Sequence, residues 1–183
     1  MRINKTLCVS RRYMQPDIFI DDFEITENTE ELHAILGRCL VIATRFDSLC
    51  DDTLKFLEFK SSLSALLPKE QFEEYVDKLF RKFTPLNSNI KAFPIDDSCK
   101  SILHIARKAR NEVAHSLCKG MTGCLDDKVD EEGFKSYLSD LISKIADGDL
   151  LISKILSIIN HDPLPRYEQG QYQTEIINWV LGK

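Results

Sequence analysis

The sequence lacks the features of a membrane-spanning or exported protein. No apolar run approaches the roughly 18 to 20 residues that a membrane-spanning helix requires. The first ten residues carry positive charge, but the apolar stretch among them is too short for a signal peptide. We therefore expect a cytoplasmic protein that has no membrane partner.

The cysteines and the common catalytic motifs give equally little indication of a metal or cofactor site. The six cysteines form no C-x-x-C pair, and no histidine is placed to complete a zinc site with Cys118 and Cys124. Cys39 and Cys50 fall on an apolar helical stripe, where a reduced thiol behaves as a small hydrophobic side chain. The sequence has no P-loop, no G-x-G-x-x-G, no H-E-x-x-H and no G-x-S-x-G motif. We therefore predict that the protein uses no metal and no cofactor.

What the chain does contain is the material of one globular domain. Of its 183 residues, 43% are hydrophobic and 29% are charged. A chain of this size and composition buries a substantial core. No internal repeat or low-complexity segment divides it.

Apolar residues at helical spacing predict a first long helix that begins near Asn28, a good N-cap residue. Its stripe repeats at alternating intervals of four and three residues, as in a heptad seam. The stripe consists of Leu32, Leu36, Cys39, Ala43, Phe46, Cys50, Thr53 and Leu57. We expect this helix to lie in a bundle or to meet a second chain. Gly37 within it is a candidate for a close helix contact.

A second helix, a loop and a third helix are expected next. Pro68 suits the first turn of the second helix. The apolar positions of that helix are Phe72, Val76, Leu79, Phe80 and Phe83. Residues 86–95 are expected to form a loop. The third helix begins at Asp96 or Asp97, both suitable N-caps, and runs to about Cys118.

A fourth, long helix is predicted from about Asp130 to residue 160, with a weak point at Gly148 and Asp149. A short helix over residues 173–181 follows it. That helix is expected to dock through Ile176, Ile177, Trp179 and Val180. The predicted fold is all-α, an antiparallel bundle of four main helices plus a short C-terminal helix. The expected divisions are an N-terminal arm at 1–25, the helical bundle at 26–160, and a C-terminal extension at 161–183 that docks on the bundle.

The third helix has two opposed faces when its residues are placed at steps of about 100°. The expected core face consists of Ile102, Ala106, Ala109, Val113 and Leu117. Almost directly opposite lie His104, Lys108, Asn111 and His115. A histidine in that position is not a core residue of its own bundle. His115 is therefore expected to face either water or a second subunit.

Arg110, Asn111 and His115 form a candidate catalytic set on this helix. Arginine has a planar head suited to bidentate phosphate contact. Histidine exchanges protons near neutral pH, and an amide can orient it. Arg110 lies about 140° round the helix from His115, so one side chain has to reach across to the other. The set is competent to cut RNA through its own 2′-hydroxyl without a metal. The competing interpretation is an ordinary solvated helix surface, because this spacing also arises by chance.

Positive charge is concentrated around the same residues. The chain carries a net charge of −5, but residues 78–119 contain nine basic and three acidic residues. That segment therefore has a net charge of +6, which leaves −11 for the remainder. Such a basic patch favours RNA, although solvated lysines on helices explain it equally well. The candidates for RNA contacts are Arg107, Lys108, Lys119 and His104.

The stretch Arg110-Asn111-Glu112-Val113-Ala114-His115 resembles the motif of the HEPN domain family. Ribonuclease members of that family carry an arginine, four to six variable residues and a histidine. The position after the arginine is usually polar and often asparagine. The resemblance covers roughly residues 28–160, and it implies a HEPN-like bundle in which Arg110 and His115 are the catalytic pair and Asn111 assists.

The resemblance also implies that two copies dimerise, so that their motif helices face one another across one composite cleft. Many such proteins are toxins or defence ribonucleases held in check by a partner, which makes an antitoxin or regulatory protein a candidate partner. Members silenced by a nucleotidyltransferase antitoxin carry a tyrosine where this chain has Leu117, so that mode of control is not inferred. The expected function is a metal-independent endoribonuclease that cleaves single-stranded or looped RNA. The alternative is a noncatalytic interaction or regulatory module, which the acidic remainder of the chain favours.

Overall fold

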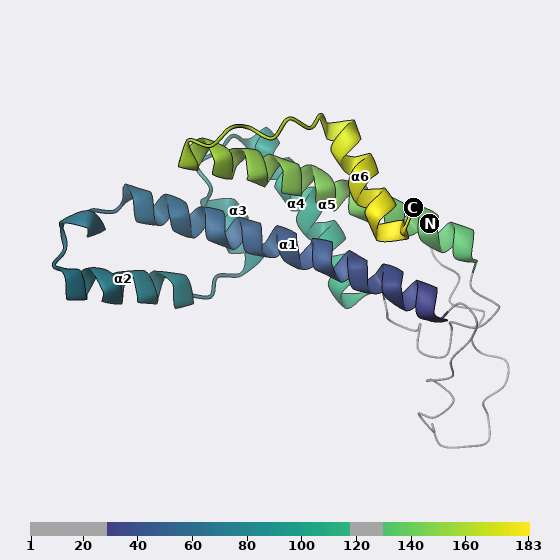
Figure 1. Ribbon diagram of the computed structural model, residues 1–183, viewed down its shortest axis with the longest axis horizontal. Helices are drawn as coiled ribbons and strands as arrows, with labels where there is room; N and C mark the ends of the chain where they lie inside the picture. Colours follow the sequence, from purple (N-terminus) through teal and green to yellow (C-terminus); the bar gives the residue numbers. More distant parts are fainter. Residues whose placement is uncertain (1–28, 118–129) are drawn as a thin grey trace, which may run out of the picture.

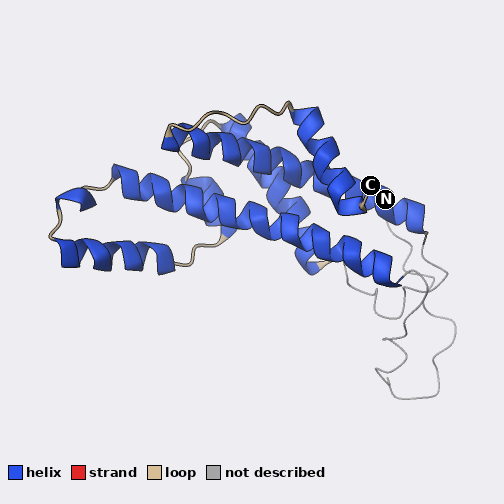
Figure 2. Ribbon diagram, viewed as in Figure 1, coloured by secondary structure: helices blue, strands red, loops and turns tan. Residues whose placement is uncertain are grey.

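The computed structural model describes residues 29–117 and 130–183, and the regular structure in these two stretches is entirely helical (Figure 2). The helices are α1 (Thr29–Ser61), the 3₁₀ turn η2 (Ser64–Leu66), α2 (Lys69–Arg81), α3 (Leu86–Ala92), α4 (Asp97–His115), α5 (Glu131–Asn160) and α6 (Gln169–Leu181). The all-α prediction is confirmed for this part of the chain. The expected N-terminal arm at 1–25, the Asn28 cap and Lys119 lie outside the described residues.

The two long helices, α1 and α5, lie side by side and run in the same direction (Figure 1). Near their starts Lys135 forms an ion pair with Glu31 at 2.7 Å, and near their ends Lys60 donates a hydrogen bond to the carbonyl of Ile159. The expectation of a uniformly antiparallel bundle is therefore wrong for this pair. The reason is topological. Helix α4 returns antiparallel to both, so the chain enters α5 in the direction of α1.

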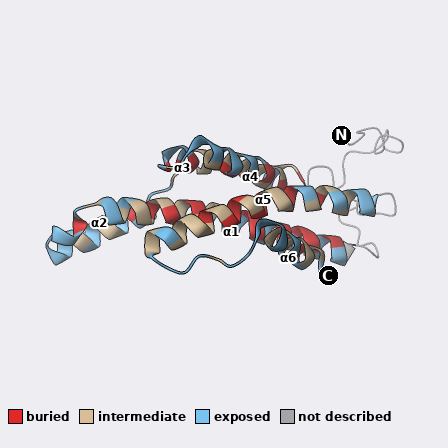
Figure 3. Cartoon of the chain, turned by 90° about the horizontal axis from the view of Figure 1, so that it is seen from above, coloured by how far each residue is buried: buried red, intermediate tan, exposed pale blue. Residues whose placement is uncertain are grey.

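Seen from above, α3 and α4 lie on one side of the α1–α5 pair and α6 lies on the other (Figure 3). Every stripe residue of α1 from Leu32 to Thr53 is buried, as its spacing predicts, and Leu57 is half-buried. Helix α2 contributes only Leu79 to the buried residues. It packs on the C-terminal half of α1, and Phe80 and Phe83, predicted as part of its apolar face, are exposed.

Helices α1, α4 and α5 approach one another closely at Gly148, inside α5. A Cβ atom at this position would be 2.4 Å from Cβ of Ala106 on α4 and 2.9 Å from a ring carbon of Phe46 on α1. Because glycine lets three helices meet there, α5 passes through the predicted weak point without a break. A Cβ at Gly37 would meet none of the described residues within 4 Å. The close contact expected at Gly37 is therefore wrong, and Gly148 supplies it.

Helix α3 occupies part of the stretch predicted to be a loop. Its seven residues include Asn89 and Ile90, both buried. The prediction failed because so short a helix, placed directly after Pro85, shows no full hydrophobic period. Helix α3 is important for function, since it forms one wall of the cleft beside the candidate site.

Helix α6 begins four residues earlier than predicted, at Gln169, and closes the other side of α1 and α5. Val180 is buried, and Nε of Arg38 donates a 2.7 Å hydrogen bond to its carbonyl. Ile176 and Ile177 pack against the core as expected, whereas Trp179 is 48% exposed and is not a docking residue. Among the helices of residues 29–117 and 130–183, none combines the length and the apolar character needed to cross a membrane.

Candidate active site

Helix α4 carries the candidate site and begins where the sequence predicts. The carboxylate of Asp96 accepts a 2.9 Å hydrogen bond from the backbone N–H of Cys99 and caps the helix. Hydrogen bonds from Ser98 and then from Cys99 lower the pKa of Asp96 below its usual value. The start of α4 is therefore fixed by a charged N-cap.

The buried face of α4 differs at one position from the predicted one. The residues of this face that are buried are Leu103, Ala106, Ala109, Val113 and, just beyond the helix, Leu117. Ile102 was predicted to be in the core, but it is 37% exposed. Leu103 is buried in its place because α3, which was not predicted, packs against this part of α4.

The structure brings the three predicted catalytic residues together at the C-terminal end of α4. Nη1 of Arg110 lies 3.3 Å from Oδ1 of Asn111 and 3.4 Å from Nε2 of His115. The arginine side chain crosses the helix surface, as the angular separation requires. His115 is exposed, whereas Arg110 and Asn111 are half-buried. The expectation that His115 faces away from its own core is confirmed.

The contact between Arg110 and His115 joins the two predicted catalytic side chains. A guanidinium group only donates hydrogen bonds, so a hydrogen bond between Nη1 of Arg110 and Nε2 of His115 requires the imidazole tautomer in which Nε2 carries no proton. In that tautomer the unprotonated nitrogen is directed at the arginine head. This is the form that a general base requires.

Asp47 of α1 completes the arrangement, and the sequence reasoning missed it. Its carboxylate forms an ion pair with Nη2 of Arg110, and the two side chains are 26% and 22% exposed. Burial raises the pKa of Asp47 above its usual value, and this effect outweighs the attraction of Arg110 and His115. The available signal was an acid directly after the buried Phe46, at the edge of the core stripe.

A cleft of about 450 Å³ opens beside Arg110, between α1, α3 and α4. Arg107, Arg110 and Asn111 line it from α4, and Asp47 and Asp51 line it from α1. His115 does not line it, so the guanidinium of Arg110 stands between the cleft and the imidazole. The cleft is therefore adjacent to the candidate catalytic pair rather than identical with it.

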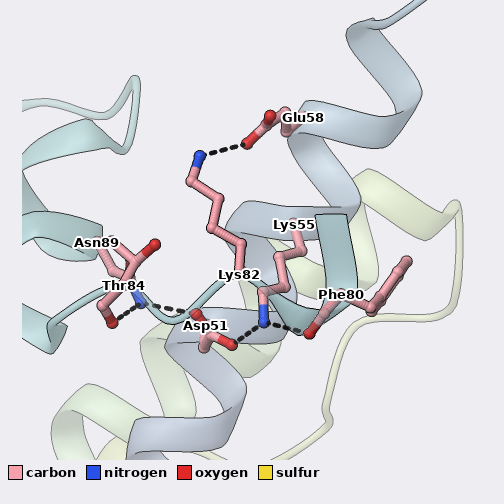
Figure 4. A network of polar contacts seen from close by, with 7 residues as sticks. All are labelled: Asp51, Lys55, Glu58, Phe80, Lys82, Thr84 and Asn89. Carbon is pink, nitrogen blue, oxygen red and sulfur yellow. Dashed lines mark hydrogen bonds and ion pairs between the residues drawn. The ribbon is translucent and has the colours of Figure 1, made fainter. Parts of the chain in front are cut away.

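A polar network holds the wall formed by α3 (Figure 4). Nζ of Lys55 pairs with Asp51 at 2.5 Å and donates a 3.0 Å hydrogen bond to the carbonyl of Phe80. The amide nitrogen of Asn89 donates to Asp51 at 3.2 Å and to the carbonyl of Thr84 at 3.5 Å. These contacts tie α3 and the end of α2 to α1, which fixes the shape of the cleft.

The predicted RNA-binding residues fall in two places. Arg107 lines the cleft, and Lys108 is exposed on the outer face of α4. His104 is half-buried, and burial, followed by the cations of Arg107, Lys91, Lys108 and Lys100, lowers its pKa. A group of positive charges therefore surrounds His104. Lys119 lies outside the described residues.

The described residues contain no group of three or more His, Cys, Asp or Glu side chains placed to hold a metal ion. Comparison of the chain with protein-family models, with curated proteins and with solved structures finds no match.

Proposed function

We propose that this protein is a metal-independent endoribonuclease that cleaves single-stranded or looped RNA. The observation that carries the proposal is the convergence of Arg110, Asn111 and His115, with the arginine head within 3.4 Å of the imidazole. RNA is the substrate because its 2′-hydroxyl supplies the nucleophile. Unpaired RNA is favoured because its backbone can reach the in-line geometry that attack requires.

In the proposed reaction, Nε2 of His115 takes the proton of the 2′-hydroxyl, and the 2′-oxygen attacks the neighbouring phosphorus. The bond from phosphorus to the 5′-oxygen breaks, that oxygen takes up a proton from water, and His115 returns its proton to the solvent. The products are a 2′,3′-cyclic phosphate and a 5′-hydroxyl end. Arg110 holds the phosphate and stabilises the charge that develops on it. Asn111 and Asp47 hold the guanidinium in place.

We propose further that two copies form the working unit, with their α4 helices facing one another. His115 is exposed on this helix, and the large apolar side chains of Ile102 and Ile105 are 37% and 47% exposed on its flank. Apolar side chains beside a polar site favour burial against a second chain. The resemblance to the HEPN domain family supports the same arrangement, together with a toxin or defence role under the control of a partner protein.

Cleavage of total RNA in the presence of a chelator tests the proposal. Wild-type protein is expected to cleave, and His115→Ala and Arg110→Ala are each expected to lose cleavage with an unchanged helical circular dichroism spectrum. His33→Ala and Arg166→Ala are matched controls, since both residues are exposed outside the site. Cleavage that survives both site substitutions, or that requires a divalent metal, would overturn the proposal.

The ion pair between Arg110 and Asp47 favours a second candidate function. A carboxylate already occupies one edge of the guanidinium and competes with a phosphate there. The same contact suits a noncatalytic interaction module, in which Arg110 is a structural residue. Expression in cells without any partner separates the two functions, because a toxin-type ribonuclease arrests growth and a noncatalytic module does not. Growth arrest that Arg110→Ala leaves intact would favour neither function and would overturn the role of this site.

A further inference from the structure

The cleft beside Arg110 is lined by acidic as well as basic side chains, which a site for phosphate alone does not require. Its two arginines, Arg107 and Arg110, face two carboxylates, Asp47 and Asp51. These four side chains carry no net charge, and Lys55 behind the wall pairs with Asp51, so phosphate binding alone does not account for the two carboxylates. A neutral group that both donates and accepts hydrogen bonds is the better match.

Several buried polar atoms of the lining residues have no hydrogen-bond partner among residues 29–117 and 130–183. These atoms are Oδ1 of Asp47, Oδ1 of Asn89, Nε of Arg107 and Nε of Arg110. Asn89 is only 1% exposed, and its amide nitrogen is bound while its oxygen is free of protein partners. Buried polar groups are normally paired. Two acceptors and two donors around one cleft call for a ligand that offers both.

The apolar part of the cleft suits a flat ring. Phe83, which lines the cleft, is 88% exposed. Exposed aromatic side chains are stacking platforms for the unpaired bases of single-stranded RNA. A volume of about 450 Å³ lies within the range of small-molecule sites and accommodates a nucleobase with its sugar.

We infer that this cleft holds the base of the RNA nucleotide next to the cleaved bond, and that it prefers a base with an exocyclic amine. The inference rests on the proposed ribonuclease function, because Arg110 is shared between the cleft and the catalytic pair. The oxygens of Asp47 and Asn89 accept hydrogens from the amino group of adenine, cytosine or guanine, and the arginines donate to ring nitrogens or carbonyls. Uracil has no amino group and is disfavoured. These four atoms are closed to solvent in the structure, so binding of a base requires the side chains that carry them to turn toward the cleft.

Binding of non-cleavable RNA tests the inference separately from catalysis. The full chain is titrated into labelled 2′-O-methyl tetranucleotides of A, C or U, which lack the attacking hydroxyl, and fluorescence anisotropy is followed. The A and C tetranucleotides are expected to bind about tenfold more tightly than the U tetranucleotide, which corresponds to about 1.4 kcal/mol in binding free energy. Phe83→Ala is expected to weaken binding of A by about tenfold, and Phe83→Trp to restore it. Leu66→Ala is the matched control, because Leu66 is an exposed apolar residue that does not line the cleft.

Equal binding of A, C and U, or a Phe83→Ala variant that binds like wild type, would overturn the inference. Adenosine monophosphate that competes as strongly as the A tetranucleotide would overturn the assignment to an RNA chain. Cleavage of ordinary RNA is measured in parallel. Cleavage without base selectivity removes only this inference, whereas base-selective binding without cleavage removes the proposed reaction and leaves the cleft as a base-binding site.

Discussion

The carboxylate of Asp47 on α1 holds the guanidinium of Arg110 on α4, so the candidate catalytic arginine is positioned by a helix other than its own. This relationship predicts opposite effects on binding and turnover when the charge is removed. Asp47→Asn takes away a competitor for the phosphate, so we expect RNA to bind more tightly. It also loosens the arginine, so we expect the cleavage rate to fall by about a hundredfold, as for a misplaced catalytic group. Single-turnover cleavage and anisotropy binding measure the two effects, and a variant unchanged in both would show that Asp47 has no positioning role.

The raised pKa of Asp47 predicts a specific pH dependence of stability. A carboxyl group with a raised pKa in the folded protein takes up its proton more readily there than in the unfolded chain. The stability gained in this way is complete below the ordinary pKa of 3.8 and is lost as pH rises through the raised pKa. The free energy of unfolding of wild type, minus that of Asp47→Asn, should therefore fall with rising pH and then level off. Urea unfolding from pH 3.5 to 7 measures it, and a difference that rises with pH would show that the attraction of Arg110 outweighs burial.

Two glycines of the long helices should respond to alanine in opposite directions. Gly148→Ala places a Cβ 2.4 Å from that of Ala106, and we expect a loss of about 1 to 3 kcal/mol in the free energy of unfolding. Gly37 is exposed inside α1, and a Cβ there would have no neighbour within 4 Å in the described part of the chain. Gly37→Ala should therefore raise stability by about 1 kcal/mol, the usual helix preference for alanine over glycine. Thermal or urea unfolding decides this, and a destabilising Gly37→Ala would point to a contact absent from the structure.

The sequence was informative where one face of a long helix determines burial. The stripe of α1 was predictable from Leu32 to Thr53 because seven buried residues repeat at a helical interval on one element. The angular position of His115 was predictable for the same reason. Local periodicity carries no information about a partner on another helix, so it could not pair Asp47 with Arg110. Nor could it reveal α3, and without α3 neither the burial of Leu103 nor the cleft could be foreseen.

His104 should report RNA binding on the outer part of α4. Burial and the neighbouring cations lower its pKa below 6.5 in the free protein. A bound phosphate offsets those cations and favours the imidazolium, so the pKa should rise when RNA binds. Nuclear magnetic resonance titration of the imidazole C–H signals, with and without a 2′-O-methyl oligonucleotide, measures the change. The exposed His33 of α1 provides an internal control. An unchanged His104 pKa in the complex would place the RNA backbone elsewhere.

The proximity of Arg110 and His115 within one chain predicts the outcome of mixing two inactive variants. If each subunit supplies its own arginine and histidine, a mixed dimer of Arg110→Ala and His115→Ala contains no intact pair. Mixing should then leave cleavage absent, since the 3.4 Å contact joins residues of the same chain. If the working pair instead combines the arginine of one subunit with the histidine of the other, mixing restores part of the activity. Light scattering after chromatography verifies that both variants still dimerise, and restored cleavage would show that the catalytic pair forms between subunits.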